Sequence, residues 1–115
     1  MANGMSMVWD PLRIAAAGVI TGNYIAVGTP LQHPARIIDI TNLCNETLYM
    51  STDGIEDMIV VPADAGKVKD ICAARSGGDL GGAYVAVNTT FYVRSPSGAA
   101  TGDSVFIEIQ YIFGD

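Results

Sequence analysis

The side chains of this sequence that could take part in chemistry are few, and they form no familiar catalytic pattern. The single histidine, His33, has no serine or cysteine nucleophile near it in the sequence and lies between two prolines. Nucleophilic catalysis needs a base within hydrogen-bonding reach of a nucleophile. We therefore interpret His33 as a hydrogen-bonded surface histidine in a connector, and the sequence predicts no enzyme.

Three carboxylates lie close together in the middle of the chain. Asp53, Glu56 and Asp57 could offer oxygen ligands to Ca²⁺. Their spacing does not match the calcium loop of an EF-hand, and a solvated turn explains them as well. We favour the turn and predict no metal and no cofactor.

A glycine-rich stretch and two cysteines are the remaining chemical features. Residues 76–82 hold four glycines but match neither a dinucleotide-binding nor a P-loop motif, so we expect a loop that orders against a neighbour, or a plain connection. Cys44 and Cys72 have no zinc-ligand spacing. A disulfide between them stays open, and two reduced, buried thiols are the favoured interpretation.

Composition limits the classes of partner. The 115 residues carry a formal charge of -6 and scattered basic residues, which argues against nucleic acid and anionic lipid. No apolar run approaches the roughly 18 residues of a membrane span, and we expect synthesis in a cytoplasm. Half of the residues are hydrophobic, which fits either apolar surface that a neighbour covers or a well-filled β core rich in alanine and valine.

The elements that must position these residues are short strands. Segments 36–42 and 47–51 alternate in polarity, and Asp53-Gly54 closes them, a pattern typical of a hairpin. Segments 12–20 and 23–27 are expected to pair around a second tight turn. No helical periodicity is present. We predict an all-β protein, an antiparallel β-sandwich or jelly-roll-like barrel of about eight short strands, with a flexible N-terminal arm (residues 1–9) and one domain (residues 10–115).

The last segment, 105–111, alternates most strictly. One face is apolar, and the other, with Glu108, is predicted to be wet or to face a partner. Trp9 is either a plug for the domain's own core, which we favour, or an anchor in a partner. The residues expected at partner contacts are Met5, Met7, Trp9, Asp79, Leu80, Ser97, Phe106 and Phe113.

The order of several sequence pieces resembles small virion structural proteins of tailed bacteriophages. These pieces are ARIIDITNLCNETLYMSTDG, VVPADAG, GAYVAVNTTFYVRS and TGDSVFIEIQYIFGD, which together with an opening segment cover nearly all of the chain from residue 12. The resemblance implies a β-sandwich that self-associates or decorates a particle. Its expected partners are the major capsid protein or other virion proteins and further copies of the same chain in a homo-oligomer. No small-molecule substrate is expected, and the expected location is the virion.

Three functions follow from this interpretation. The first is a capsid cement or decoration protein that bridges major capsid subunits, and the second is a neck or tail component, such as an adaptor or a fibre-anchoring ring. The third, from a different class, is a carbohydrate-binding module. It would use exposed aromatic side chains, with Tyr49, Tyr84, Tyr92 and Tyr111 as candidates.

Overall fold

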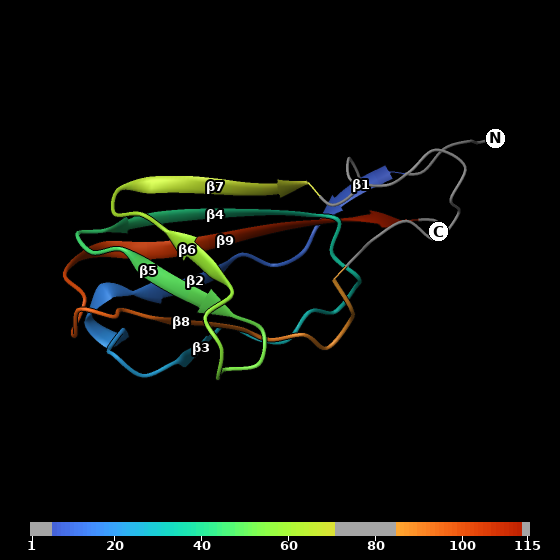
Figure 1. Cartoon of the computed structure of the whole chain (residues 1–115). Helices are drawn as coiled ribbons and strands as arrows, with labels where there is room; N and C mark the ends of the chain where they lie inside the picture. The colour runs from blue at the N-terminus through green and yellow to red at the C-terminus, as the bar shows by residue number, and fades with distance from the viewer. Residues whose placement is uncertain (1–5, 71–84, 114–115) are drawn as a thin grey trace.

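The computed structural model describes residues 6–70 and 85–113, and these residues form two antiparallel sheets packed face to face (Figure 1). The all-β prediction is therefore confirmed. No helix in these two ranges is long and apolar enough to cross a membrane. The elements are β1 (Ser6–Trp9), β2 (Arg13–Ala16), the 3-10 helix η1 (Ala17–Val19), β3 (Ile25–Val27), β4 (Ile37–Cys44), β5 (Leu48–Ser51), β6 (Ile59–Val61), β7 (Ala65–Asp70), β8 (Phe91–Arg94) and β9 (Gly102–Phe113).

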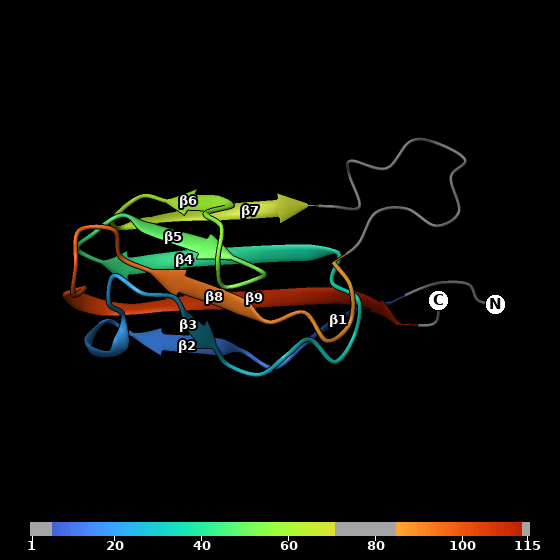
Figure 2. The ribbon, with the colours of Figure 1, turned by 60° about the horizontal axis from the view of Figure 1, so that its bottom comes forward.

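The strands pair like one long hairpin that is rolled up into two layers. β2 pairs with β9, β3 with β8, β4 with β7, and β5 with β6. Two further pairings, β4 with β9 and β5 with β8, give the order β2-β9-β4-β7 in sheet A and β3-β8-β5-β6 in sheet B (Figure 2). Sheet A has a fifth strand, β1, which also pairs with β9. This nesting is the jelly-roll arrangement, one of the two architectures that the sequence predicts.

The core lies between the sheets. In β9, Val105, Ile107 and Ile109 are fully buried while Glu108 is exposed, which confirms the predicted alternation. Burying a large aliphatic side chain stabilises the fold by roughly 1.5–3 kcal/mol. Other fully buried apolar side chains come from both sheets and from the connections, among them Ile20, Leu31, Ile40, Leu48, Met50, Val61 and Val93.

The turn predicted at Asp53-Gly54 is confirmed, and it lies in the β5–β6 hairpin. Gly54 has a φ of +75°, which glycine adopts without steric cost. Ser51 Oγ accepts hydrogen bonds from the N–H groups of Asp53 and Gly54, both at 3.0 Å. Asp53 Oδ1 accepts from the N–H groups of Ile55 at 2.8 Å and Glu56 at 3.0 Å. The local sequence therefore builds this turn.

The two other predicted hairpins are wrong. The segments 36–42 and 47–51 become β4 in sheet A and β5 in sheet B, so the chain crosses between layers. The crossing is tied to the start of β9, because Asn45 N–H donates to Thr101 O and Thr101 N–H donates to Glu46 Oε1, both at 2.8 Å. Likewise β2 lies in sheet A and β3 in sheet B. A tight turn can connect two neighbouring strands of one sheet or two strands in different sheets, so the turn residues do not distinguish these cases.

The expected flexible arm is also corrected. Its last residues form β1, which pairs with β9 through Ser6 opposite Phe113 and Trp9 opposite Gln110. Residues directly opposite one another share a face of the sheet. Since Ile109 points into the core, Gln110 and Trp9 point outward, and Trp9 is 59% exposed. The favoured prediction that Trp9 fills the domain's own core is therefore wrong.

In the connection before β8, Val85 makes an isolated antiparallel bridge with Ala35. The glycine-rich stretch over residues 76–82 and Cys72 lie outside the described residues. The β8–β9 loop covers residues 95–101, and β9 begins at Gly102.

Candidate interaction surface

One edge of sheet A is interrupted, and the interruption opens a recess. β1 and β2 lie along the same side of β9, β1 opposite Gln110–Phe113 and β2 opposite Ser104–Ile107. Between them, the segment 10–12 makes one backbone hydrogen bond to β9, from Asp10 N–H to Ile109 O at 2.8 Å. Pro11 has no backbone donor and cannot extend the ladder. The chain therefore interrupts its pairing with β9 next to Glu108, between the ends of β1 and β2.

The recess has a volume of about 430 Å³ and is lined by Trp9, Asp10, Leu12 and Glu108. Trp9 is 59% exposed and Leu12 is 51% exposed. Next along the edge, Ile14 is 50% exposed and lies opposite Phe106, which is half-buried. We call these five residues the edge surface: Trp9, Leu12, Ile14, Phe106 and Glu108.

Glu108 of the edge surface and the neighbouring Asp39 give this part of sheet A a negative charge. Glu108 in β9 lies directly opposite Asp39 in β4, so both project from the outer face of sheet A. Within the described part of the chain, no ion pair joins either carboxylate to a cation. Two neighbouring carboxylates of like charge favour the approach of a positive group.

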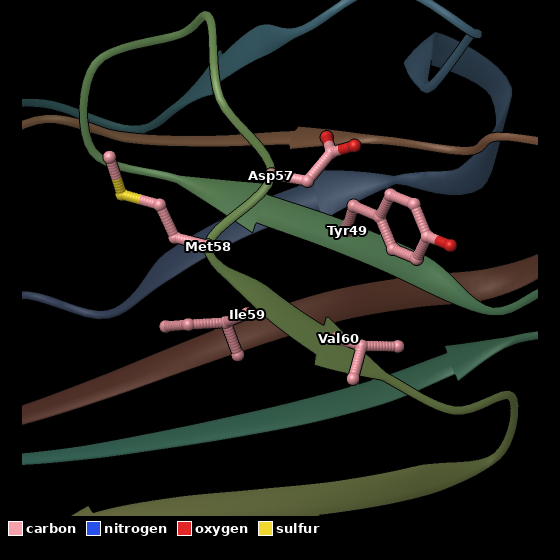
Figure 3. Close-up of a pocket in the computed structure, with 5 residues that line it drawn as sticks. All are labelled: Tyr49, Asp57, Met58, Ile59 and Val60. Atoms are coloured by element: carbon pink, nitrogen blue, oxygen red, sulfur yellow. The ribbon is translucent and has the colours of Figure 1, made fainter.

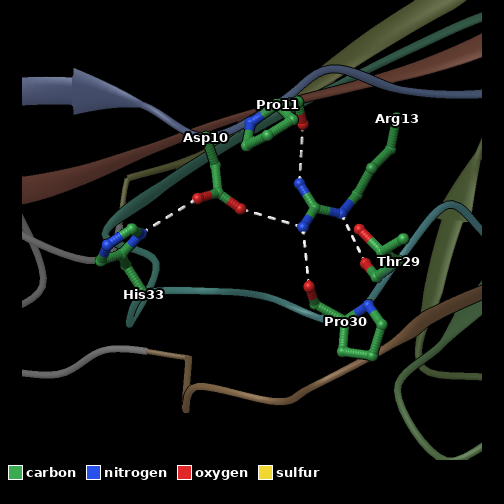
Figure 4. Close-up of polar contacts among 6 residues, drawn as sticks. All are labelled: Asp10, Pro11, Arg13, Thr29, Pro30 and His33. Carbon is green, nitrogen blue, oxygen red and sulfur yellow. Dashed lines mark hydrogen bonds and ion pairs between the residues drawn. The ribbon is translucent and has the colours of Figure 1, made fainter.

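The floor of the recess is fixed by a buried ion pair (Figure 4). Arg13 Nη2 lies 2.9 Å from Asp10 Oδ2, and the two side chains are 2% and 1% exposed. Arg13 also donates to the carbonyl oxygens of Thr29 and Pro11, both at 2.8 Å, and of Pro30 at 3.0 Å. The guanidinium thus ties the segment before β2 to the connection between β3 and β4.

His33 completes this network from the connection between β3 and β4. Its Nδ1 lies 3.2 Å from Asp10 Oδ1, and its ring stacks on Tyr111 with centroids 3.9 Å apart. The side chain is 42% exposed, so the predicted hydrogen-bonded surface histidine is confirmed. In this arrangement His33 packs and binds a carboxylate, and no serine or cysteine lies among its described contacts.

Sheet B has a second recess, of about 450 Å³, on its outer face (Figure 3). It is lined by Tyr49, Asp57, Met58, Ile59 and Val60. In the register of the sheet, Tyr49 lies between Val60 of β6 and Arg94 of β8.

A charged cluster stands at the rim of this second recess. Arg94 Nε and Nη2 donate to the two oxygens of Asp57 at 2.9 and 2.8 Å, and Tyr24 donates to the same carboxylate. These hydrogen bonds, first from Arg94 and then from Tyr24, lower the pKa of Asp57 to about 2. Burial, followed by the hydrogen bond to Asp57, raises the pKa of Tyr24 to about 12. Asp57 is thus a structural anchor that holds the 52–58 loop on sheet B.

The predicted acidic group does not converge on one point. Asp53 bonds the backbone of its own turn, while Asp57 faces Arg94. Over residues 6–70 and 85–113, no three His, Cys, Asp or Glu side chains are placed to hold a metal ion. The solvated turn that we favoured is confirmed for Asp53, and Glu56 is exposed.

Cys44 is a free thiol and is fully buried, as the sequence predicts. Its Sγ donates to the carbonyl oxygen of Asp103 at 3.2 Å. Burial raises the pKa of the thiol, which makes it a poor nucleophile at neutral pH.

The residues predicted to contact a partner are only partly brought together. Trp9 and Phe106 lie on the outer face of sheet A, whereas Ser97 lies in the β8–β9 loop, beyond the other end of β9. Met7 and Phe113 belong to β1 and β9, where the structure describes their backbone only. Met5, Asp79 and Leu80 lie outside the described residues.

Sequence reasoning missed Leu12 and Ile14. They lie in an apolar run that looks like core, and nothing in the sequence around Arg13 shows that this arginine is the buried residue of the run. A buried arginine turns its two neighbours outward, because side chains alternate along a strand.

Comparison with family models, with curated proteins and with solved structures found no match. The resemblance to phage structural proteins stays a prediction.

Proposed function

We propose that this chain is a non-enzymatic structural protein of a virion, first of all a capsid cement or decoration protein that bridges major capsid subunits. The observation that carries the proposal is the edge surface. Trp9, Leu12 and Ile14 are each at least half exposed and lie within six residues of one another. Contiguous exposed apolar patches mark protein interaction sites, and tryptophan is among the side chains enriched as interface anchors.

The fold is compatible with this role. Jelly rolls form viral capsid and lectin domains, and because one fold hosts many functions, the fold supports the proposal only as an analogy. Standard interfaces bury about 800 Å² on each partner, so a domain of 115 residues has room to contact several shell subunits at once.

The carbohydrate-binding alternative finds less support in the described residues. The ring of Tyr92 lies against Gly54, where an added Cβ would be 3.5 Å away. Tyr111 is stacked on His33. The guanidinium carbon of Arg94 lies over the ring of Tyr49, 5.2 Å from the centroid of that ring. A sugar-binding platform needs an open aromatic face, and each of these rings has one face occupied.

Mass and copy number test the proposed function. Light scattering gives the mass of the purified chain, and quantitative mass spectrometry gives its copy number in the particle with which it co-purifies. A monomer or small oligomer in hundreds of copies is the expected result. A stable ring present in about a dozen copies favours the neck or tail alternative, and a monomer with no particle contradicts the proposal.

Point variants are needed to locate the contact. Deleting residues 1–9 would remove β1 from sheet A, so it does not separate attachment from folding. Trp9→Ser changes an outward-facing side chain and should lower the copy number. Ile55→Ser is the matched control, because Ile55 is 79% exposed on the loop over the other sheet.

A further inference from the structure

We propose that the recess between β1 and β2 binds a segment of the partner protein that carries a lysine or arginine next to an aliphatic side chain. This inference rests on the proposed function, because it assumes a protein partner, and it names the chemistry of the contact.

The charge of the recess selects a cationic group. Glu108 lines the recess, and Asp39 lies opposite it on the neighbouring strand. Neither carboxylate has a cation as an ion-pair partner among the described residues. The chain as a whole carries a charge of -6, which adds to the attraction at long range.

The apolar walls select the neighbouring group. Trp9 and Leu12 line the recess, and each residue has more than half of its surface exposed. An aliphatic side chain of the partner would cover them, and the stem of a lysine or arginine can lie along apolar surface while its charged end reaches Glu108. The indole of Trp9 also attracts a cation that approaches its face.

A second copy of this chain fits the recess less well. A two-fold dimer through the edge surface would bring Glu108 and Asp39 of one copy toward the same residues of the other. Like charges that face one another across an interface cost several kcal/mol. The expected homo-oligomer therefore uses another face, and the recess remains for a basic partner.

The single tryptophan makes the recess directly observable, since Trp9 is the only one in the chain. The probes are two peptides of equal apolar content, acetyl-Lys-Leu-Val-Lys-amide and acetyl-Glu-Leu-Val-Glu-amide. Each is titrated to about 10 mM, because one ion pair with one apolar contact gives at most millimolar affinity. The basic peptide should shift the emission of Trp9 to shorter wavelength, and the acidic peptide should leave it unchanged.

Two charge-matched variants locate the effect. Glu108→Gln should weaken binding of the basic peptide by about threefold to fivefold, the upper part of the range for an exposed ion pair. Glu56→Gln changes the net charge equally on the loop over sheet B and should leave the affinity unchanged. Asp39→Asn is a second test at the recess, with a smaller loss expected because Asp39 lies one strand away.

The proposal is overturned if neither peptide shifts Trp9, if both shift it equally, or if Glu108→Gln and Glu56→Gln behave alike. These outcomes are independent of the copy number in the particle. If the chain is abundant in particles but does not bind the basic peptide, the proposed function stands and this inference is wrong.

Discussion

Replacing Arg13 by methionine should strongly destabilise the protein, because it leaves the buried carboxylate of Asp10 without its cation. The two side chains are 2% and 1% exposed and lie 2.9 Å apart. Methionine keeps an unbranched apolar side chain at this position but donates no hydrogen bond. Three carbonyl oxygens, those of Pro11, Thr29 and Pro30, would lose their donor at the same time.

The magnitude follows from the burial of the pair. Removing one partner of a buried ion pair costs about 3–5 kcal/mol. A domain of this size is stable by about 5–15 kcal/mol, so Tm should fall by roughly 10–20 °C. Asp10→Asn should cost less, because the three carbonyl oxygens still accept from Arg13. The double variant should lose less than the sum of the two single losses, with a coupling of about 1–3 kcal/mol.

Urea unfolding of the wild type, both single variants and the double variant, followed by circular dichroism, measures these free energies. Arg94→Met is the matched control, because it removes a guanidinium from a solvent-screened ion pair on sheet B and should cost much less. A loss below about 1 kcal/mol for Arg13→Met, or additive single losses, would refute the reasoning, since surface substitutions already reach about 0.5 kcal/mol.

Three further predictions follow from local geometry. Gly28→Ala should lower the thermal stability more than Gly98→Ala. Both glycines have a positive φ, which costs about 1–2 kcal/mol for alanine. Only at Gly28 would the added Cβ also clash with the buried Arg13, because it would lie 2.6 Å from the Cγ of that side chain. Because the pKa of Asp57 lies at about 2, below its ordinary 3.8, the stability that this carboxylate adds is complete above about pH 3.8 and is lost as the pH falls toward 2. In Arg94→Gln, an NMR titration should show that pKa returning toward 3.8. With the other cysteine changed to serine, Cys44 should react with a disulfide reagent at pH 8 only after unfolding, since burial raises the pKa of its thiol, and rapid reaction of the native protein would contradict this.

The sequence predicts the faces of the strands better than their partners. The alternation of Val105, Ile107 and Ile109 marks a buried face because side chains alternate with period two in any strand. The pairing of β2 with β9 joins segments at opposite ends of the chain, and no local signal carries such a contact. A turn between two strands also leaves open whether the chain stays in one sheet or crosses to the other.

The candidate site depends on an exception to the rule that, in a strand, the apolar side chains face the core and the polar ones face solvent in alternation. That rule alone places Ile14 inside and Arg13 outside, whereas the structure has Arg13 buried and Ile14 half exposed. The reversal is stable because Asp10 and three backbone carbonyls satisfy the guanidinium. Those partners come from the segment before β2 and from the distant connection between β3 and β4, so the edge surface becomes visible only in three dimensions.

A competition for places on the particle tests the central claim most directly. Isotope-labelled wild type and unlabelled Trp9→Ser are mixed in equal amounts, added to particles that lack the chain, and quantified by mass spectrometry after washing. If the edge surface attaches the protein, the bound ratio should favour the wild type by about ten to one or more, the effect of losing an interface anchor, while Ile55→Ser should compete equally. Equal incorporation of Trp9→Ser, or no incorporation of the wild type, would contradict the account.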